Sequence, residues 1–66
     1  MKVIVNGNSE MIDTDMTIGD FLKDKKLDVD KVVVEHNKTI VDTSFYDTVE
    51  LNDGDLLEIL RFVGGG

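Results

Sequence analysis

The chain ends in three consecutive glycines, Gly64, Gly65 and Gly66, directly after a hydrophobic segment. Glycine has no Cβ and loses the most backbone entropy on ordering, so a folded protein gains no stability from such an end. The four residues from Val63 onward extend at most about 13 to 14 Å at 3.3 to 3.6 Å per residue. The tail is therefore long enough to carry a terminal carboxylate beyond the fold into a narrow channel, which only glycines would pass. The alternative is a chain end without a role, because disorder collects at termini.

The other side chains that could do chemistry favour structural roles. The sequence has no cysteine, which excludes a disulfide scaffold, a zinc finger and a cysteine nucleophile. We expect His36 to be a solvent-exposed turn residue, because a metal site would need at least two further ligands. Asp28 and Asp30 have the spacing of the opening of a calcium loop but lack its glycine, and Asp53 and Asp55 flank a turn glycine. We therefore expect no metal site and no intrinsic catalytic residue.

Length and charge limit the class of protein. With 66 residues, of which 41% are hydrophobic, the chain can form one small domain. Seven basic residues against fourteen acidic ones give a net charge of −7, which repels nucleic acid and suits a partner with a basic face, or serves only to keep the protein soluble. No apolar run approaches the ~20 residues of a membrane span, and the start of the chain does not resemble a secretory signal. We expect a cytoplasmic protein that does not bind membranes.

Hydrophobic patterning predicts a mixed sheet with one helix. Five strands are expected over the ranges 2–6, 9–13, 32–34, 39–41 and 56–62. Thr17 and Asp20 predict the start of an amphipathic helix that runs to Lys26. An irregular or 3₁₀ stretch should follow the fourth strand, with Phe45 or Tyr46 filling the core. Because a lone helix joins the two halves, the first and last strands are expected side by side at the centre of the sheet.

The closing strand has two distinct faces. Alternation places Leu57 and Ile59 on one face and Leu60 and Phe62 on the other. If the first pair packs on the helix, the second pair forms an apolar docking site beside the tail. The alternative is that neighbouring side chains cover it. Arg61 either reaches a carboxylate on the partner or forms a local ion pair, and the sequence favours the local pair.

The hairpin, the helix, the turn Asp53-Gly54-Asp55, the closing strand and the Gly65-Gly66 end together resemble the sulfur carrier family of thiamine biosynthesis, the ThiS family. The resemblance covers the whole chain. It implies an α+β, ubiquitin-like β-grasp fold of order ββαβββ, with a single domain over residues 1–66 and a flexible tail over 63–66. It also implies a carrier and not an enzyme.

The family resemblance assigns a chemical role to Gly66. An adenylating enzyme of the ubiquitin-activating type would activate its carboxylate with ATP and Mg²⁺, a cysteine desulfurase or another persulfide donor would supply sulfur, and the thiocarboxylate would pass to thiazole synthase. An α-carboxyl has an ordinary pKa of about 3.3 to 3.7, so at neutral pH it can attack phosphorus without a general base. Gly64 and Gly65 would thread into the partner, and docking would use the residues Leu60, Arg61, Phe62 and Val63.

Three other functions share parts of this pattern. The small subunit of molybdopterin synthase has a similar fold and tail but is usually longer. A ubiquitin-like modifier would instead attach its terminus to a lysine. A simple interaction domain would have an inert tail.

Overall fold

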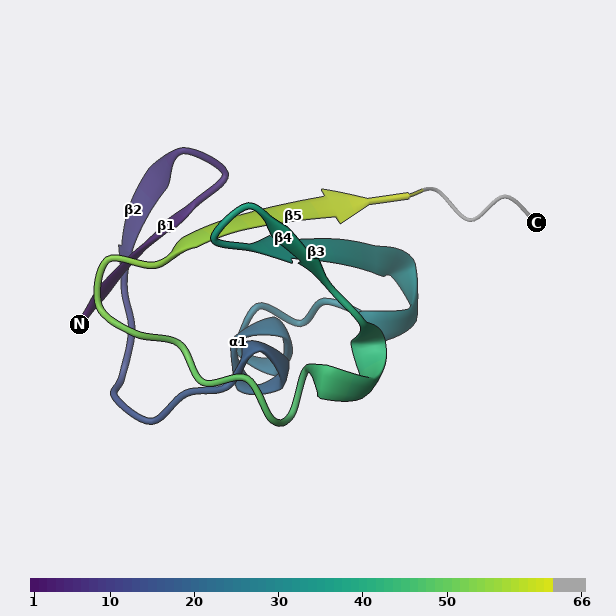
Figure 1. The fold of residues 1–66 in the computed structure, drawn as a ribbon, viewed down its shortest axis with the longest axis horizontal. Coiled ribbons are helices and arrows are strands. Elements are labelled where there is room, and N and C mark those ends of the chain that lie inside the picture. Colours follow the sequence, from purple (N-terminus) through teal and green to yellow (C-terminus); the bar gives the residue numbers. More distant parts are fainter. Residues whose placement is uncertain (63–66) are drawn as a thin grey trace.

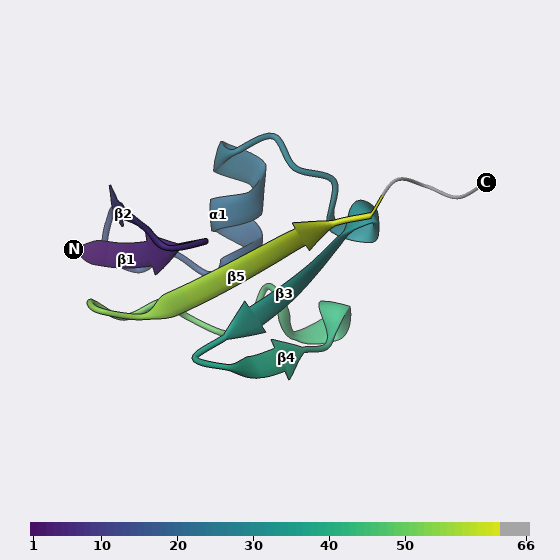
Figure 2. The ribbon, with the colours of Figure 1, turned by 90° about the horizontal axis from the view of Figure 1, so that it is seen from above.

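A computed structural model of the chain describes residues 1–62, so the expected flexible tail, 63–66, lies outside the described residues. Five strands form one mixed sheet, and a single helix lies across one of its faces (Figure 1). The strands are ordered β2-β1-β5-β3-β4 across the sheet, as the view from above shows (Figure 2). This arrangement confirms the expected α+β architecture and the order ββαβββ.

The first hairpin consists of β1 (Lys2–Val5) and β2 (Asn8–Met11), which pair antiparallel. Asn6 and Gly7 join them with φ angles of 49° and 85°. The second residue is a glycine, which adopts this left-handed backbone without steric cost. The second strand begins and ends earlier than the sequence predicted, because only four residues on each side pair.

The helix α1 (Ile18–Asp24) begins at a capping box. The Asp20 amide donates to the Thr17 hydroxyl oxygen and the Thr17 amide donates to the Asp20 carboxylate, both at 3.1 Å. The predicted start is therefore confirmed, and free amides of the first turn are satisfied by side chains. The helix is shorter than predicted, because Lys26 adopts a φ of 59° and turns the chain back toward the sheet.

The chain after α1 supplies three strands and two short 3₁₀ turns within the described residues. These elements are η1 (Val29–Lys31), β3 (Val32–His36), β4 (Thr39–Val41), η2 (Thr43–Phe45) and β5 (Leu56–Arg61). β5 lies at the centre of the sheet, parallel to β1 and antiparallel to β3. The first and last strands therefore lie side by side, as the sequence predicted.

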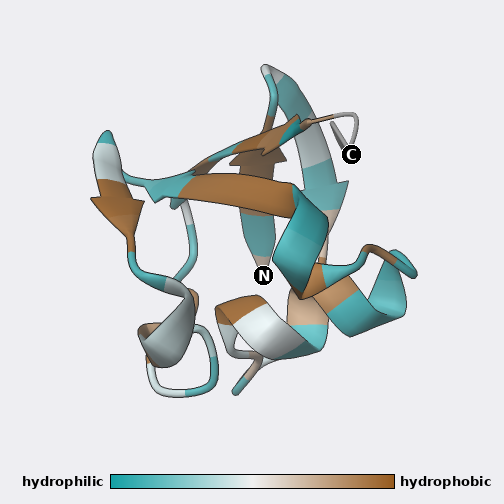
Figure 3. Ribbon diagram, turned by 90° about the vertical axis from the view of Figure 1, so that its right-hand side faces the viewer, coloured by the Kyte–Doolittle hydropathy of each residue, from teal (hydrophilic) through white to brown (hydrophobic). Residues whose placement is uncertain are grey.

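The core lies between the sheet and α1, where hydrophobic segments of the two layers face each other (Figure 3). Phe21, Leu22 and Leu57 are almost fully buried there. Of the two aromatic candidates after β4, Tyr46 enters the core with 3% of its surface exposed, whereas Phe45 stays 55% exposed. Tyr46 follows η2, and its carbonyl accepts the Gly19 amide at 2.8 Å, so it is held against the start of the helix.

Candidate functional site

The candidate site is the end of β5 and the sheet face beside it. The Phe62 amide donates to the Lys31 carbonyl at 3.2 Å, which fastens the last described residue to the body of the domain. Farther back, the Asn6 side chain accepts the Ile59 amide at 2.8 Å and donates to the Ile59 carbonyl at 3.2 Å. The side-chain amide of Asn6 thus continues the hydrogen bonding between β1 and β5 beyond the last residue of β1. The strand that leads to the tail is therefore held on both sides.

Leu60 and Phe62 lie on the face of the sheet opposite the helix. Leu57 is 1% and Ile59 9% exposed, whereas Leu60 is 57% and Phe62 51% exposed. The predicted division of the two faces is confirmed, and side chains of residues 1–62 leave this pair exposed. An apolar pair of this exposure beside the tail suits docking of a protein partner.

Arg61 lies on the other side of the strand. It lines a hollow on the helix side together with Lys25, Leu27 and Ile59. Among residues 1–62 it makes no ion pair, so the local ion pair that the sequence favoured is not found. A partner contact through Arg61 would therefore use a different face from one through Leu60 and Phe62. Val63, Gly64, Gly65 and Gly66 lie outside the described residues.

The expectation for His36 was wrong. Its side chain is only 17% exposed, and its Nε2 lies 2.6 Å from a carboxylate oxygen of Asp55. The same carboxylate accepts the Asn52 amide at 2.8 Å and the Asn37 side chain at 3.2 Å. Asn37 in turn accepts the Leu56 amide at 2.9 Å. This cluster joins the β3–β4 turn to the start of β5, so it positions the strand that carries the site.

Asp55 should make folding sensitive to acid. Burial raises its pKa, but hydrogen bonds from His36, the Asn52 amide and Asn37 outweigh burial and hold the pKa below its ordinary value. A carboxyl with a depressed folded-state pKa stabilises the fold above its unfolded-state pKa of about 3.9 and loses this contribution as pH falls through the folded-state value.

We expect Asp55→Asn to lower the free energy of unfolding by about 1 to 3 kcal/mol at neutral pH. The difference from the parent should shrink below about pH 4. Urea unfolding of both proteins at neutral and acidic pH measures it. An equal difference at both pH values would show that the carboxylate charge is not the cause.

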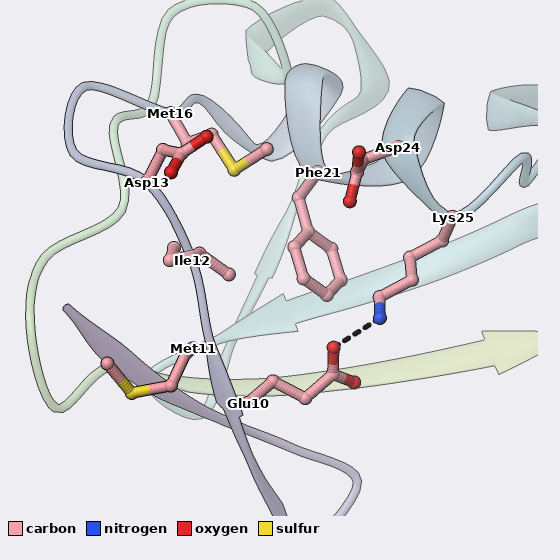
Figure 4. Close-up of a pocket in the computed structure, with 8 residues that line it drawn as sticks. All are labelled: Glu10, Met11, Ile12, Asp13, Met16, Phe21, Asp24 and Lys25. Carbon is pink, nitrogen blue, oxygen red and sulfur yellow. Dashed lines mark ion pairs between the residues drawn. The ribbon is translucent and has the colours of Figure 1, made fainter.

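A second surface feature is the groove between β2 and α1 (Figure 4). Glu10 and Lys25 form an ion pair across it, and the Lys25 ammonium lies 5.5 Å from the centre of the Phe21 ring. Met11 and Met16 line the outer part. The pair ties the hairpin to the helix, and because both side chains are partly exposed it contributes little to stability.

The described residues hold no group of three or more His, Cys, Asp or Glu side chains that could bind a metal ion. Asp28 instead accepts the Asp30 amide at 2.9 Å and caps η1. Asp53 accepts the Lys2 amide at 2.7 Å. Within residues 1–62, no helix is long and apolar enough to cross a membrane.

No local pattern in the sequence singles out the residues that share the open sheet face with Leu60, which are Glu35, Glu58 and Ile40. Glu35 pairs with Glu58 on β5 and with Ile40 on β4. The alternation within each strand indicated their faces, but the register that brings them together depends on pairing between distant segments.

Comparisons with known proteins agree with this architecture. The model of the ThiS family matches residues 3–66. The sulfur carrier protein ThiS of Bacillus subtilis is 48% identical over 50 residues, which cover 76% of both chains. The crystal structure of the thiamine biosynthesis protein ThiS from Geobacter metallireducens superposes with a TM-score of 0.86 at 30% identity and full coverage of both chains.

A thiazole synthase of Paramagnetospirillum magneticum is 44% identical over all 66 residues, which make up 20% of its length. A thiazole synthase of Magnetococcus marinus is 33% identical over the same span, again 20% of its length. The chain thus spans about a fifth of these two relatives and about three quarters of the Bacillus protein. The similarity covers the hairpin, the helix and the closing strand, and it extends through the glycine tail. The chain therefore belongs to the ThiS family, the sulfur carrier proteins of thiamine biosynthesis, and has their β-grasp fold.

Proposed function

We propose that the chain carries sulfur as a thiocarboxylate on Gly66 and donates it for formation of the thiamine thiazole ring. The observation that carries this proposal is the position of β5. The central strand of the sheet ends at Arg61, shortly before Gly64 in the sequence, and the exposed side chains of Leu60 and Phe62 lie at this end of the strand. A rigid body with an apolar docking face thus precedes a segment that can enter a narrow channel.

The proposed chemistry needs no catalytic group on this chain. The Gly66 carboxylate attacks the α-phosphorus of ATP on an adenylating enzyme, which supplies Mg²⁺ and releases pyrophosphate. The terminal sulfur of a persulfide then attacks the carbonyl carbon and AMP leaves. Cleavage of the remaining S–S bond by a second thiol yields the thiocarboxylate and a disulfide on the donor. The chain is therefore the substrate of these steps and not their catalyst.

The two faces of β5 would make different contacts with a partner protein. Leu60 and Phe62 would contact the adenylating enzyme. Val63, Gly64 and Gly65 would enter a narrow channel of that enzyme. Arg61 would contact the partner at the opposite face of β5. We propose a cysteine desulfurase or another persulfide donor as the sulfur source.

Thiazole synthase is the acceptor that the comparisons support. Two relatives with that name contain a segment similar to the whole of this chain. A shared chain would keep donor and acceptor together at high effective concentration. We propose that thiazole synthase receives the sulfur from this chain and that this transfer takes place in the cytoplasm.

Deletion of the gene in the source organism tests the proposed pathway. Growth should then require thiamine or its thiazole moiety, and enzymes that use molybdenum cofactor should stay active. The parent chain should restore growth, and a chain without Gly66 should not. Loss of molybdenum enzymes without a thiamine requirement would instead support a molybdopterin synthase subunit. If the deletion produced neither of these phenotypes, a carrier role in either pathway would be contradicted.

A further inference from the structure

Two carboxylates lie directly opposite each other on the open face of the sheet. Glu35 on β3 and Glu58 on β5 are Cα partners in the antiparallel register. Their neighbours Val34, Leu57 and Ile59 are buried against the helix side, so both glutamates face away from it. Like charges at directly opposite positions destabilise a sheet. The pair therefore works against the stability of the pairing between β3 and β5.

Apolar side chains surround the two carboxylates. Ile40, which is 67% exposed, pairs with Glu35, and Leu60 lies two residues after Glu58 on the same face. A hollow of about 210 Å³ beside them is lined by both glutamates and by Ile4, Gly7, Lys38, Leu56 and Leu57. Although Lys38 lines this hollow, neither glutamate has an ion pair within residues 1–62. Within the described part of the chain, the two charges thus lack an ion-pair partner and lie beside apolar side chains.

This combination restricts what can cover the face. A purely apolar partner would bury two uncompensated carboxylates, which is costly. A second copy of the chain, docked face to face, would bring two more carboxylates and another net charge of −7. The phosphates of a nucleic acid would be repelled as well. What fits is a protein surface that is apolar and carries a positive side chain.

Arginine fits the pair better than lysine. Its planar guanidinium donates in two directions at once and is more weakly hydrated than an ammonium, so its transfer beneath apolar side chains is less costly. We propose that Glu35 and Glu58 jointly receive one arginine side chain of the protein that docks on the open face. This inference rests on the proposed function, in which that protein is the adenylating enzyme.

Calorimetric titration of the adenylating enzyme from the same organism tests the inference. The chains compared are the parent, Glu35→Gln, Glu58→Gln, the double variant, and the control Asp13→Asn/Asp24→Asn. The control changes the net charge as the double variant does, but its residues line the groove between β2 and α1. Each single glutamate variant should weaken binding about tenfold, since one charge-assisted hydrogen bond is lost.

Sharing of one arginine predicts that the two effects do not add. The double variant should bind only slightly more weakly than either single variant, and the control should bind within about twofold of the parent. Thermal unfolding should show the double variant to be at least as stable as the parent, because repulsion across the strands is removed. Additive losses would overturn a shared side chain, and equal losses in the control would show general charge attraction. If the parent chain did not bind the enzyme at all, the proposed function itself would fail.

Discussion

Deletion of Gly66 is expected to reduce ATP–pyrophosphate exchange by the adenylating enzyme about a hundredfold or more while the fold stays intact. One residue of extended chain spans about 3.3 to 3.6 Å. Loss of the last glycine therefore withdraws the carboxylate by that distance from the α-phosphorus of ATP, and a displacement of about 1 Å can already cost a hundredfold in rate. The buried hydrophobic residues of the described part of the chain run from Val3 to Ile59, and the deletion leaves them in place, so thermal unfolding should be unchanged.

Two further variants test separately the position of the terminal carboxylate and the width of the tail. An extra glycine after Gly66 keeps the tail slender but displaces the carboxylate, and it should abolish exchange as deletion does. Gly65→Ala keeps the length but adds a Cβ in the narrow part of the channel, and it should reduce exchange while leaving some activity. If ATP–pyrophosphate exchange ran at the parental rate with the chain that lacks Gly66, the proposed role of Gly66 would be contradicted.

Phe62→Asp is expected to weaken binding to the adenylating enzyme by about tenfold to a hundredfold. Full burial of a phenylalanine side chain contributes about 1.5 to 3 kcal/mol, and each 1.4 kcal/mol corresponds to a factor of ten in affinity. Because Phe62 is 51% exposed in the free domain, the substitution should have little effect on folding. Calorimetric titration gives the affinity, and thermal unfolding gives the stability.

Phe45→Asp provides a matched control. Phe45 is 55% exposed, but it lies on η2, which is on the helix side of the sheet (Figure 1). The substitution introduces the same charge at a residue of the same type and similar exposure, and binding should stay within about twofold of the parent. Equal affinities of Phe62→Asp and the parent would remove Phe62 from the interface, and equal losses in both variants would show that added negative charge alone weakens binding.

Local signals in the sequence predicted most of the fold. The spacing of Thr17 and Asp20 gave the helix start, because a capping box depends on residues three positions apart. β-branched residues identified the strands, and alternation along β5 separated the buried Leu57 from the exposed Leu60. Each of these features depends on residues close together in the sequence, either within one capping box or along one strand.

The failures concern contacts between distant segments. His36 was expected in solvent, but it meets Asp55, 19 residues later, because β3 and β5 pair antiparallel. The choice between Phe45 and Tyr46 stayed open, because the segment after β4 has no periodic pattern. The opposition of Glu35 and Glu58 follows from a register that no local signal specifies.

The chemical state of the terminal acid in the living cell tests the central claim most directly. Intact-mass measurement of the protein purified from its source organism should detect a fraction of molecules in which one oxygen is replaced by sulfur, and fragmentation should place the replacement on Gly66. That fraction should disappear when the adenylating enzyme is deleted. A population that carries only oxygen under thiamine limitation, or that is found joined to lysines of other proteins, would contradict a sulfur carrier.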